Sequence, residues 1–255
     1  MTLEFSRIEE FAVIRLNRPE FLNALSFGLI RELDQVLDQV ALSGARTLLF
    51  TGAGDKAFCA GADIAELAHR SLVQTHDDTR FGQTVFSKIE SLPMPSVAII
   101  NGYAFGGGLE LALACSFRLA TPNAKLGLPE IKLGLIPGYG GTQRLPRVVG
   151  PTRALEMIMS GKTLDGATAL AWGLVSRLVD GDAVAAGMAF AREFSGFSLP
   201  VLKLARQAVQ GALDMPVQEG LKTEADLSTQ AYQTADAAEG MAAFLAKRQP
   251  QFKDG

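Results

Sequence analysis

The 255-residue sequence has few cysteines and no long uninterrupted apolar run. Cys59 and Cys115 are its two cysteines, and they form no CxxC pair. Zinc sites and disulfide frameworks need more cysteines at closer spacing, so we expect no metal site and two reduced core thiols. Glycine, proline or charge breaks every apolar run well short of the roughly 20 residues that a bilayer span requires. The N-terminus also lacks the pattern of a secretion signal, which predicts a cytoplasmic protein that does not enter the membrane.

Neither sign of charge is in large excess, and tryptophan and tyrosine are scarce. The formal net charge is −3, which provides no basic field for nucleic acid, so nucleic acid is not an expected partner. One Trp and three Tyr argue against a sugar-stacking cleft, although paired carboxylates also serve glycoside hydrolases. What the chain does have is a hydrophobic content of 48%, enough to bury a large core.

The hydrophobic pattern predicts an α/β fold. Strand-like segments are expected at residues 3–8, 11–16, 47–51 and 96–101, with helical stretches between them. Residues 26–40 carry leucine and valine at helical spacing behind Ser26, which can cap the helix. A further helix is expected over 64–89, interrupted by an exposed polar patch that contains His69 and His76. Without a third ligand nearby, these two histidines are interpreted as solvated residues.

The last quarter of the chain reads as helical. Residues 183–194, 200–213 and 217–247 are nearly continuous helix formers. Their apolar content exceeds what a short exposed appendage should show, which indicates packing against other subunits. The predicted division is a core over residues 1–195 and a helical oligomerisation region over residues 196–255.

Two glycine-containing turns each precede a predicted helix. Gly61 and Ala62 end one loop before a helix that starts near Asp63, and Gly106–Gly108 precede the helix that carries Glu110. If the fold brings these helix starts together, their N–H groups can stabilise one developing negative oxygen, but two ordinary turns are an equal alternative. The segment at Gly52, Gly54 and Ala57 fits a dinucleotide-binding pattern only weakly, because no helix is expected at its second glycine.

Glu110 and Glu130 occupy positions where a surface glutamate would be misplaced. Glu110 is flanked by the apolar run LELAL, and Glu130 lies between Pro129 and Ile131. Buried carboxylates must be paired, protonated or used, so the pair indicates acid/base chemistry. The structural alternative is a helix-start carboxylate and a loop carboxylate paired with Lys132 or Arg144. Tyr139, in the glycine-rich loop that follows, either lines a pocket or packs.

Several segments in this order resemble the enoyl-CoA hydratase/isomerase (crotonase) superfamily, the hydratase branch in particular. They are LNRPEFLNALS, AFCAGADI, NGYAFGGGLELAL, LGLPEIKLGLIPGYGGTQRLPRVVG, ALAWGLVSRLV and EGMAAFLAKRQPQF. The resemblance implies a crotonase-type spiral of ββα units, followed by a helical C-terminal region that builds homotrimers, commonly paired as hexamers. It implies no cofactor, because coenzyme A enters as part of the acyl-CoA substrate.

The resemblance also assigns roles to residues. The oxyanion hole maps onto the backbone N–H groups of Ala62 and Gly107, and the catalytic glutamates map onto Glu110 and Glu130. Substrate-binding positions are expected at Ala24, Ala60, Asp63, Ile64, Ala65 and Gly138. The implied reaction is hydration of a 2-enoyl-CoA to a 3-hydroxyacyl-CoA, with Glu110 favoured as activator of water and Glu130 as the acid at C2.

Other functions that are compatible with this resemblance stay open. A 3-enoyl-CoA to 2-enoyl-CoA isomerase would need Glu130 alone, and an oligomeric scaffold or an RNA binder can use the same fold without catalysis. Leu128 and Phe21 depart from the usual family pattern, so the sequence predicts neither acyl chain length nor pathway.

Overall fold

The computed structural model describes residues 2–68 and 70–255, so the prediction for His69 lies outside the described residues. The chain forms two units, one containing the described residues up to Leu92 together with Ser96–Phe190, the other containing Pro93–Pro95 and Ala191–Gly255. The division at residues 195 and 196 remains a prediction about domains. Within the described ranges, no helix is both long enough and apolar enough to cross a bilayer.

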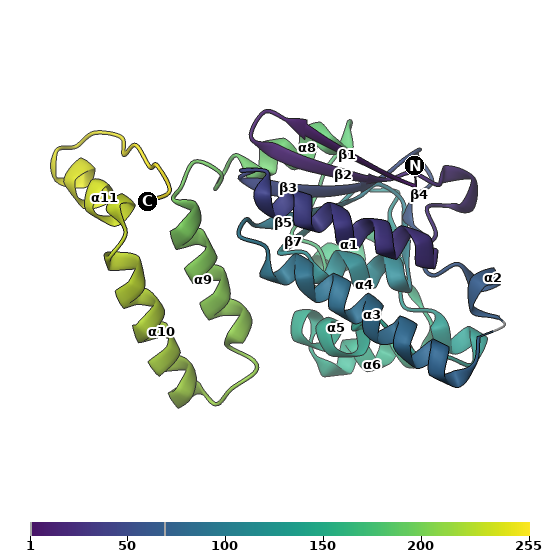
Figure 1. The fold of residues 1–255 in the computed structure, drawn as a ribbon. Helices are drawn as coiled ribbons and strands as arrows, with labels where there is room; N and C mark the ends of the chain where they lie inside the picture. Colours follow the sequence, from purple (N-terminus) through teal and green to yellow (C-terminus); the bar gives the residue numbers. More distant parts are fainter. Residues whose placement is uncertain (1, 69) are drawn as a thin grey trace. The chain divides into compact units, whose positions relative to one another are not determined.

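The first unit is built on a six-stranded sheet (Figure 1). Its strands, in spatial order, are β1 (Leu3–Ile8), β2 (Phe11–Leu16), β3 (Thr47–Gly52), β5 (Ser96–Ile100), β7 (Phe117–Ala120) and β10 (Arg177–Leu178). β1 is antiparallel to β2, and the strands from β2 to β10 are parallel to their neighbours. All residues of β3 and β5 are buried, as expected for parallel strands that are covered on both faces.

A second sheet of four short strands carries the segments that lead into the site. These strands are β4 (Ala57–Cys59), β6 (Tyr103–Phe105), β8 (Lys125–Gly127) and the antiparallel β9 (Thr163–Asp165). The pairs β3–β4, β5–β6 and β7–β8 each place the first strand in the large sheet and the second in the small one. A helix follows each pair, so successive ββα units form a spiral and the α/β prediction is confirmed.

Of the helices predicted in the first unit, α1 forms where the sequence pattern places it, and the helix expected over 64–89 needs a correction. α1 (Phe27–Leu42) begins after Ser26, whose Oγ accepts the N–H of Leu29 at 3.1 Å, as predicted. The helix expected over 64–89 is instead two helices, α2 (Ile64–Leu67) and α3 (Leu72–Ser91). Ser71 and Gln74 cap each other's backbone at the start of α3. This capping box begins a new helix, although the spacing of apolar residues alone predicts one continuous helix.

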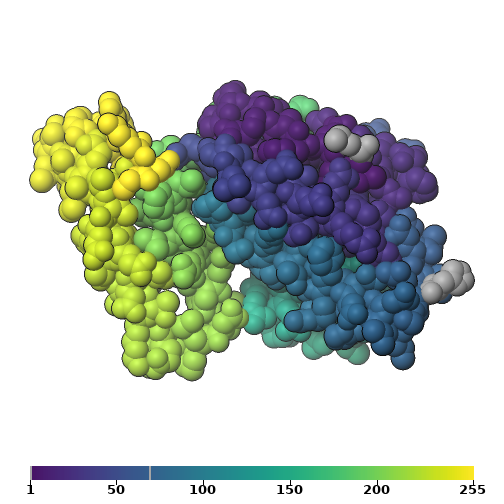
Figure 2. All heavy atoms as spheres, in the orientation of Figure 1, coloured from purple at the N-terminus to yellow at the C-terminus, as the bar shows by residue number. Residues whose placement is uncertain are grey.

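The polar patch at the start of α3 is exposed, as expected, and His76 lies on it. α1 and α3 lie side by side along the unit, and Lys88 of α3 bonds to Asp34 and Asp38 of α1 (Figures 1 and 2). The remaining helices of this unit are α4 (Gly107–Ala114), α5 (Gly141–Val149), α6 (Pro151–Ser160), α7 (Gly166–Ala171) and α8 (Ala183–Ala191), the last of which ends at the boundary. Short 3₁₀ turns lie at η1 (Pro19–Phe21) and η2 (Glu130–Leu133).

The second unit is helical throughout its described secondary structure, with α9 (Leu199–Gly211), α10 (Val217–Tyr232) and α11 (Ala235–Leu245). The stretch predicted as one helix over 217–247 divides at Gln233, because Thr234 caps α11 through its side chain. The buried carboxylate of Asp236 accepts the N–H groups of Lys253 and Asp254, which fixes the tail of the chain against α11. Large apolar side chains remain exposed on these helices and on the turn between α9 and α10: Val209, Leu213, Val217, Leu221, Tyr232, Met241, Phe244 and Leu245.

Candidate functional site

A cavity of about 440 Å³ in the first unit collects most of the predicted site residues. It lies where β4, β6 and β8 lead into α2, α4 and η2. Seven of the ten predicted residues line it: Ala60, Ala62, Ile64, Gly107, Glu110, Glu130 and Gly138. The fold therefore brings together two segments, residues 60–67 and 105–110, that are far apart in the sequence.

The two helix starts touch through their backbones. A Cβ on Gly61 would lie 3.1 Å from the carbonyl oxygen of Phe105, and one on Gly108 would lie 2.1 Å from the carbonyl oxygen of Cys59. Only glycine permits this approach. Gly106 adds a φ of +50°, a conformation that side chains rarely adopt, directly before α4.

Both amides predicted for the oxyanion hole are left without a protein acceptor. Leu25 forms a parallel bridge with Ala62, using the carbonyl of Gly61 and the N–H of Asp63, so the N–H of Ala62 itself points away from this pairing. Gly107 is the first residue of α4, and its N–H has no intrahelical acceptor. Among the described residues, no carbonyl or side-chain oxygen pairs with either amide. Two N–H donors therefore remain for a ligand at this cavity.

Glu110 is 1% exposed and is held by two backbone amides. Its Oε1 accepts the N–H of Tyr139 at 2.8 Å and the N–H of Gly141 at 2.7 Å. Burial raises the pKa of Glu110 to about 7, and the nearby Glu130 carboxylate raises it further, while the two amides and the Arg144 guanidinium oppose the rise. The carboxyl group is thus poised to exchange a proton near neutral pH.

Glu130 has a different environment on the same cavity. It is half-buried at the start of η2, and its Oε1 lies 3.0 Å from the position that a Cβ on Gly106 would take. Its Oε2 is buried without a hydrogen-bond partner among the described residues. Burial raises the pKa of Glu130, so its neutral form is favoured more than in an exposed glutamate. A buried carboxyl oxygen without a partner indicates a place for a water molecule or a ligand.

The alternative prediction that Glu130 is a loop carboxylate paired with Arg144 is wrong. Arg144 donates from Nε and Nη2 to the two carboxylate oxygens of Glu90, each at 2.7 Å. Tyr139 both lines the cavity and packs, with its ring edge-on to Phe86 at 5.5 Å. The dinucleotide pattern is also excluded as a binding turn, because Ala57 begins strand β4 where a helix would be required.

Three predicted substrate-binding residues lie outside the cavity lining. The carbonyl of Ala24 accepts from Arg18 at 2.7 Å, Asp63 pairs with Arg18 at 3.1 Å, and Ala65 is exposed on α2. Ala24 and Asp63 thus meet at one arginine beside the loop that carries Ala62. Their role with a ligand remains a prediction.

Sequence reasoning missed the apolar side of the cavity. The missed apolar lining residues are Leu67, Phe105, Pro129, Leu133, Leu135 and Ile136, and Thr75, Thr79 and Lys132 add polar groups to the lining. Leu133, Leu135 and Ile136 are exposed, and the apolar run LGLIP after Glu130 was the one sequence signal for them. An apolar wall beside two carboxyl groups and two free amides suits a molecule with a polar reactive end and an apolar chain.

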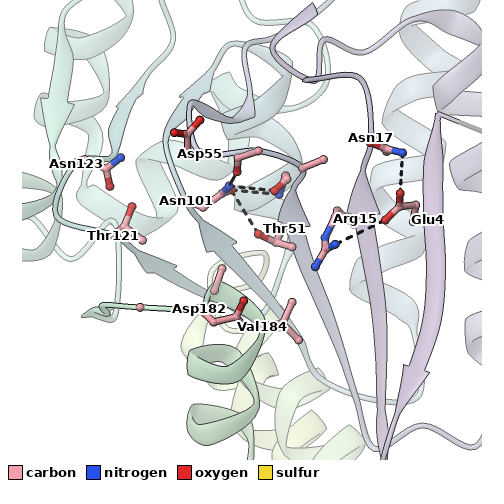
Figure 3. Close-up of a pocket in the computed structure, with 15 residues that line it drawn as sticks. Glu4, Arg15, Asn17, Thr51, Asp55, Asn101, Thr121, Asn123, Asp182 and Val184 are labelled. Atoms are coloured by element: carbon pink, nitrogen blue, oxygen red, sulfur yellow. Dashed lines mark hydrogen bonds and ion pairs between the residues drawn. The ribbon is translucent and has the colours of Figure 1, made fainter. Parts of the chain in front are cut away.

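A larger hollow of about 580 Å³ lies where β2, β3, β5 and β7 end (Figure 3). Several of its polar side chains have protein partners: Asn101 bonds to the backbone of Gly52 and Gly54, and Glu4 pairs with Asn17 and Arg15. These bonds hold the turn after β3 and the edge of β1 and β2. The hollow contains no counterpart of the two free amides and paired glutamates.

Metal ligation has no visible basis within residues 2–68 and 70–255. No group of three or more His, Cys, Asp or Glu side chains there could hold a metal ion. Cys59 and Cys115 are buried, and burial raises the pKa of both thiols to about 12.

Comparison with known proteins gives consistent matches along almost the whole chain. The sequence model of the family described as "Enoyl-CoA hydratase/isomerase" matches residues 7–255. A Bacillus subtilis protein named "Probable enoyl-CoA hydratase" is 42% identical over 253 residues, covering 96% of each chain. A Syntrophomonas wolfei protein named "Crotonyl-CoA hydratase" is 37% identical over 249 residues, covering 96% of this chain and 95% of its own.

Solved structures agree with the sequence matches. A crystal structure titled as an enoyl-CoA hydratase from Bacillus anthracis superposes with a TM-score of 0.95 at 36% identity, and both chains are covered completely. The similarity therefore extends through the first unit, with its cavity, and through the C-terminal helices.

Proposed function

Because the chain belongs to the enoyl-CoA hydratase/isomerase family, we propose that it adds water across the 2,3 double bond of a 2-enoyl-CoA to give a 3-hydroxyacyl-CoA. The observation that carries this proposal is the unequal hydrogen bonding of two glutamates on one cavity. Glu110 is held by two amides through a single oxygen, whereas Glu130 presents a buried oxygen without a partner. Two free backbone amides lie beside them on the same cavity.

The amides of Ala62 and Gly107 would receive the thioester carbonyl oxygen. Addition of water at C3 moves electron density through the double bond onto this oxygen, which becomes an enolate. Two fixed N–H donors stabilise the enolate more than the neutral carbonyl, so they lower the barrier rather than only binding the substrate. Loss of one such donor typically costs about a hundred- to a thousandfold in kcat.

The two carboxyl groups would divide the proton transfers. Two amide donors favour the ionised form of Glu110, so Glu110 takes a proton from water as the hydroxide adds to C3. Glu130, in its neutral form, then gives its proton to C2 as the enolate collapses. The product gains H at C2 and OH at C3, and one proton moves from Glu130 to Glu110. Because the carboxyl groups interact, their apparent pKa values belong to the pair.

The proposal is tested with crotonyl-CoA and purified protein. We expect loss of the enoyl-thioester absorbance with the wild type, and a fall of about a hundred- to ten-thousandfold in kcat for Glu110→Gln and Glu130→Gln. Glu156→Gln, at an exposed position on α6, is the matched control and should keep full activity. No turnover by the wild type, also with longer and branched thioesters, would contradict the proposal.

Isomerisation of a 3-enoyl-CoA is the second candidate, because Glu130 alone can shuttle a proton between C2 and C4. Glu110→Gln distinguishes the two. Loss of hydration with retained isomerisation means that the site carries both activities, whereas unchanged hydration would remove Glu110 from the mechanism.

The oligomeric state and the cellular location of the protein are also proposals. The exposed apolar residues of α9, α10 and α11 support a homotrimer, or a homohexamer as a dimer of trimers. The reaction as written needs only the acyl-CoA and water, with coenzyme A entering as part of the substrate. A cytoplasmic location is consistent with an acyl-CoA substrate.

A further inference from the structure

Glu110 depends on a loop for its orientation, and the loop is held from outside the cavity. The 137–141 loop supplies both N–H donors to Glu110, from Tyr139 and Gly141. Gly140, between them, has a φ of +112°, a left-handed conformation that turns the chain sharply. Any rotation of the peptide planes in this loop would move one or both donors away from the carboxylate.

Two side chains hold these peptide planes by their carbonyl oxygens. Gln83 of α3 donates from Nε2 to the carbonyl of Gly138 at 2.8 Å, and the same peptide plane carries the N–H of Tyr139. Arg144 of α5 donates from Nη1 to the carbonyl of Tyr139 at 2.9 Å. The Arg144 contact therefore lies between the two peptide units that bond to Glu110.

Arg144 is itself fixed to α3. Its guanidinium makes the bidentate pair with the Glu90 carboxylate and donates to Ser87 Oγ at 3.2 Å. Gln83, Ser87 and Glu90 are spaced by four and three residues, which places them on one face of α3. A Cβ on Gly140 would lie 2.1 Å from Nη1 of Arg144, so the loop is shaped around the guanidinium. The side chain of Arg144 is only 15% exposed, which limits the alternatives open to it.

We propose that Arg144 and Gln83 are positioning residues for the hydration, which orient the Glu110 carboxylate through the 137–141 loop. This inference rests on the proposed function of Glu110. Neither side chain lines the cavity, so they act on Glu110 and not on the substrate. Chains of hydrogen bonds through peptide groups also polarise one another, so the Gln83 contact strengthens the Tyr139 donor.

The charged and titratable groups around Glu110 give the arrangement a second consequence. They are Glu130 on η2, Arg144 on α5 with Glu90 behind it, and the Tyr139 phenol, whose pKa is raised by burial. Arg144 is the one cation among them, and both it and the two loop amides lower the pKa of Glu110. Weakening the contacts of Arg144 and the loop amides must raise the pKa of Glu110. Glu110 would then become protonated, and lose its function as a base, at a higher pH than in the wild type.

The test compares Arg144→Lys and Gln83→Met with the wild type. Lysine keeps a positive charge but cannot bond to Glu90 with two prongs and to Tyr139 at once, and methionine removes the donor to Gly138 with little change in volume. Misplacement of a catalytic group by about 1 Å can cost roughly a hundredfold, so we expect kcat to fall about ten- to a hundredfold. KM should stay within about twofold, because binding in the ground state is not altered. The acid limb of the pH profile should move to higher pH.

Arg147→Lys is the matched control, because Arg147 lies on the same helix and donates to the carbonyl of Gln143 instead of the loop. It should change neither kcat nor the acid limb. Folding is checked by thermal melting, and if Arg144→Lys does not fold, Gln83→Met and Glu90→Gln carry the test. Folded variants with the wild-type kcat and acid limb would overturn the inference.

The failure of this inference is separable from failure of the proposed function. If Glu110→Gln abolishes hydration while Arg144→Lys, Gln83→Met and Glu90→Gln behave like the wild type, only the positioning role is wrong. If Glu110→Gln itself keeps full activity, the proposed role of Glu110 is wrong, and the loop has no catalytic group to position.

Discussion

At the scale of single residues, the contrast between Glu110 and Glu130 is the most consequential feature. Both lie in surroundings that disfavour charge, and the N–H groups of Tyr139 and Gly141 restore part of the lost solvation of Glu110, whereas Oε2 of Glu130 has no partner among the described residues. Two like carboxyl groups in one cavity resist simultaneous ionisation. Near neutral pH the pair therefore favours one charged and one neutral carboxyl group, and the two members titrate as a coupled pair.

This contrast predicts a pH profile. Burial raises the pKa of Glu110 to about 7, and Glu110 must be ionised to accept a proton from water, so kcat/KM should fall as the pH drops through about 7. Loss of the remaining proton from the pair should lower the rate again at higher pH, giving a bell-shaped profile whose two limbs belong to the coupled pair. The measurement is the initial rate of crotonyl-CoA hydration at subsaturating substrate. An acid limb at about 4.3, the ordinary value of an exposed glutamate, would contradict the assignment.

At the scale of secondary structure elements, the contact between β4 and α4 sets the spacing of the two amides proposed for the oxyanion hole. The carbonyl of Cys59 lies against Gly108 so closely that a Cβ would meet it at 2.1 Å. Backbone atoms cannot swing aside as a flexible side chain can, so a substitution here must push α4 away from the small sheet.

Gly108→Ala should therefore destabilise the protein and impair catalysis together. Overpacking of a buried site typically costs about 1–3 kcal/mol, and displacement of the N–H of Gly107 adds a loss of kcat. The matched control is Gly28→Ala in α1, where a Cβ would meet only Ser26 Oγ, at an ordinary 3.8 Å. The comparison is made by chemical unfolding and by the hydration rate. Equal stability of Gly108→Ala and the wild type would show that α4 can move freely.

The longer strands and the amphipathic helix α1 were predictable from the sequence because burial leaves a strong pattern, whereas the short strands and α5, α6 and α7 were not predicted. The strands at residues 3–8 and 11–16, the Ser26 cap and the two glycine-rich helix starts follow from local residue types. The break between α2 and α3 was missed, because a capping box depends on two polar residues and does not interrupt the apolar spacing.

The parts of the site that the sequence could not give are pairings over long separations. The bonds from Tyr139 and Gly141 to Glu110 use backbone donors, which any residue other than proline could supply. Arg144 and Glu90 are 54 residues apart, and nothing in either segment selects the partner. The glutamates themselves were recognisable, since a carboxylate within an apolar run is rare whatever its partner.

At the scale of the whole molecule, the second unit presents apolar side chains that a solitary chain would leave in water. Phe244 and Leu245 are 83% and 82% exposed at the end of α11. Exposed apolar residues that recur along three helices favour burial in an assembly of identical chains.

We predict that the molecular mass of the wild type, measured by sedimentation, is about three or six times the 27.1 kDa of one chain. Phe244→Asp should lower this mass, because a charge in an apolar interface is left unpaired. Leu42→Asp, at an equally exposed residue of α1, is the matched control and should leave the mass unchanged. A wild type that stays monomeric on concentration would rule out the trimer.

The amides proposed for the oxyanion hole belong to the main chain, and this has a consequence for how mutations are tolerated. No exchange of a side chain can delete the N–H of Ala62 or Gly107 except replacement by proline. Random mutation can abolish either carboxyl group by many single substitutions, whereas every substitution other than proline can only displace the amides by distorting the chain around them. The two amides are thereby less sensitive to substitution than the two carboxyl groups. Variants of this fold that acquire new chemistry would keep the two amides while exchanging the acids and bases around them.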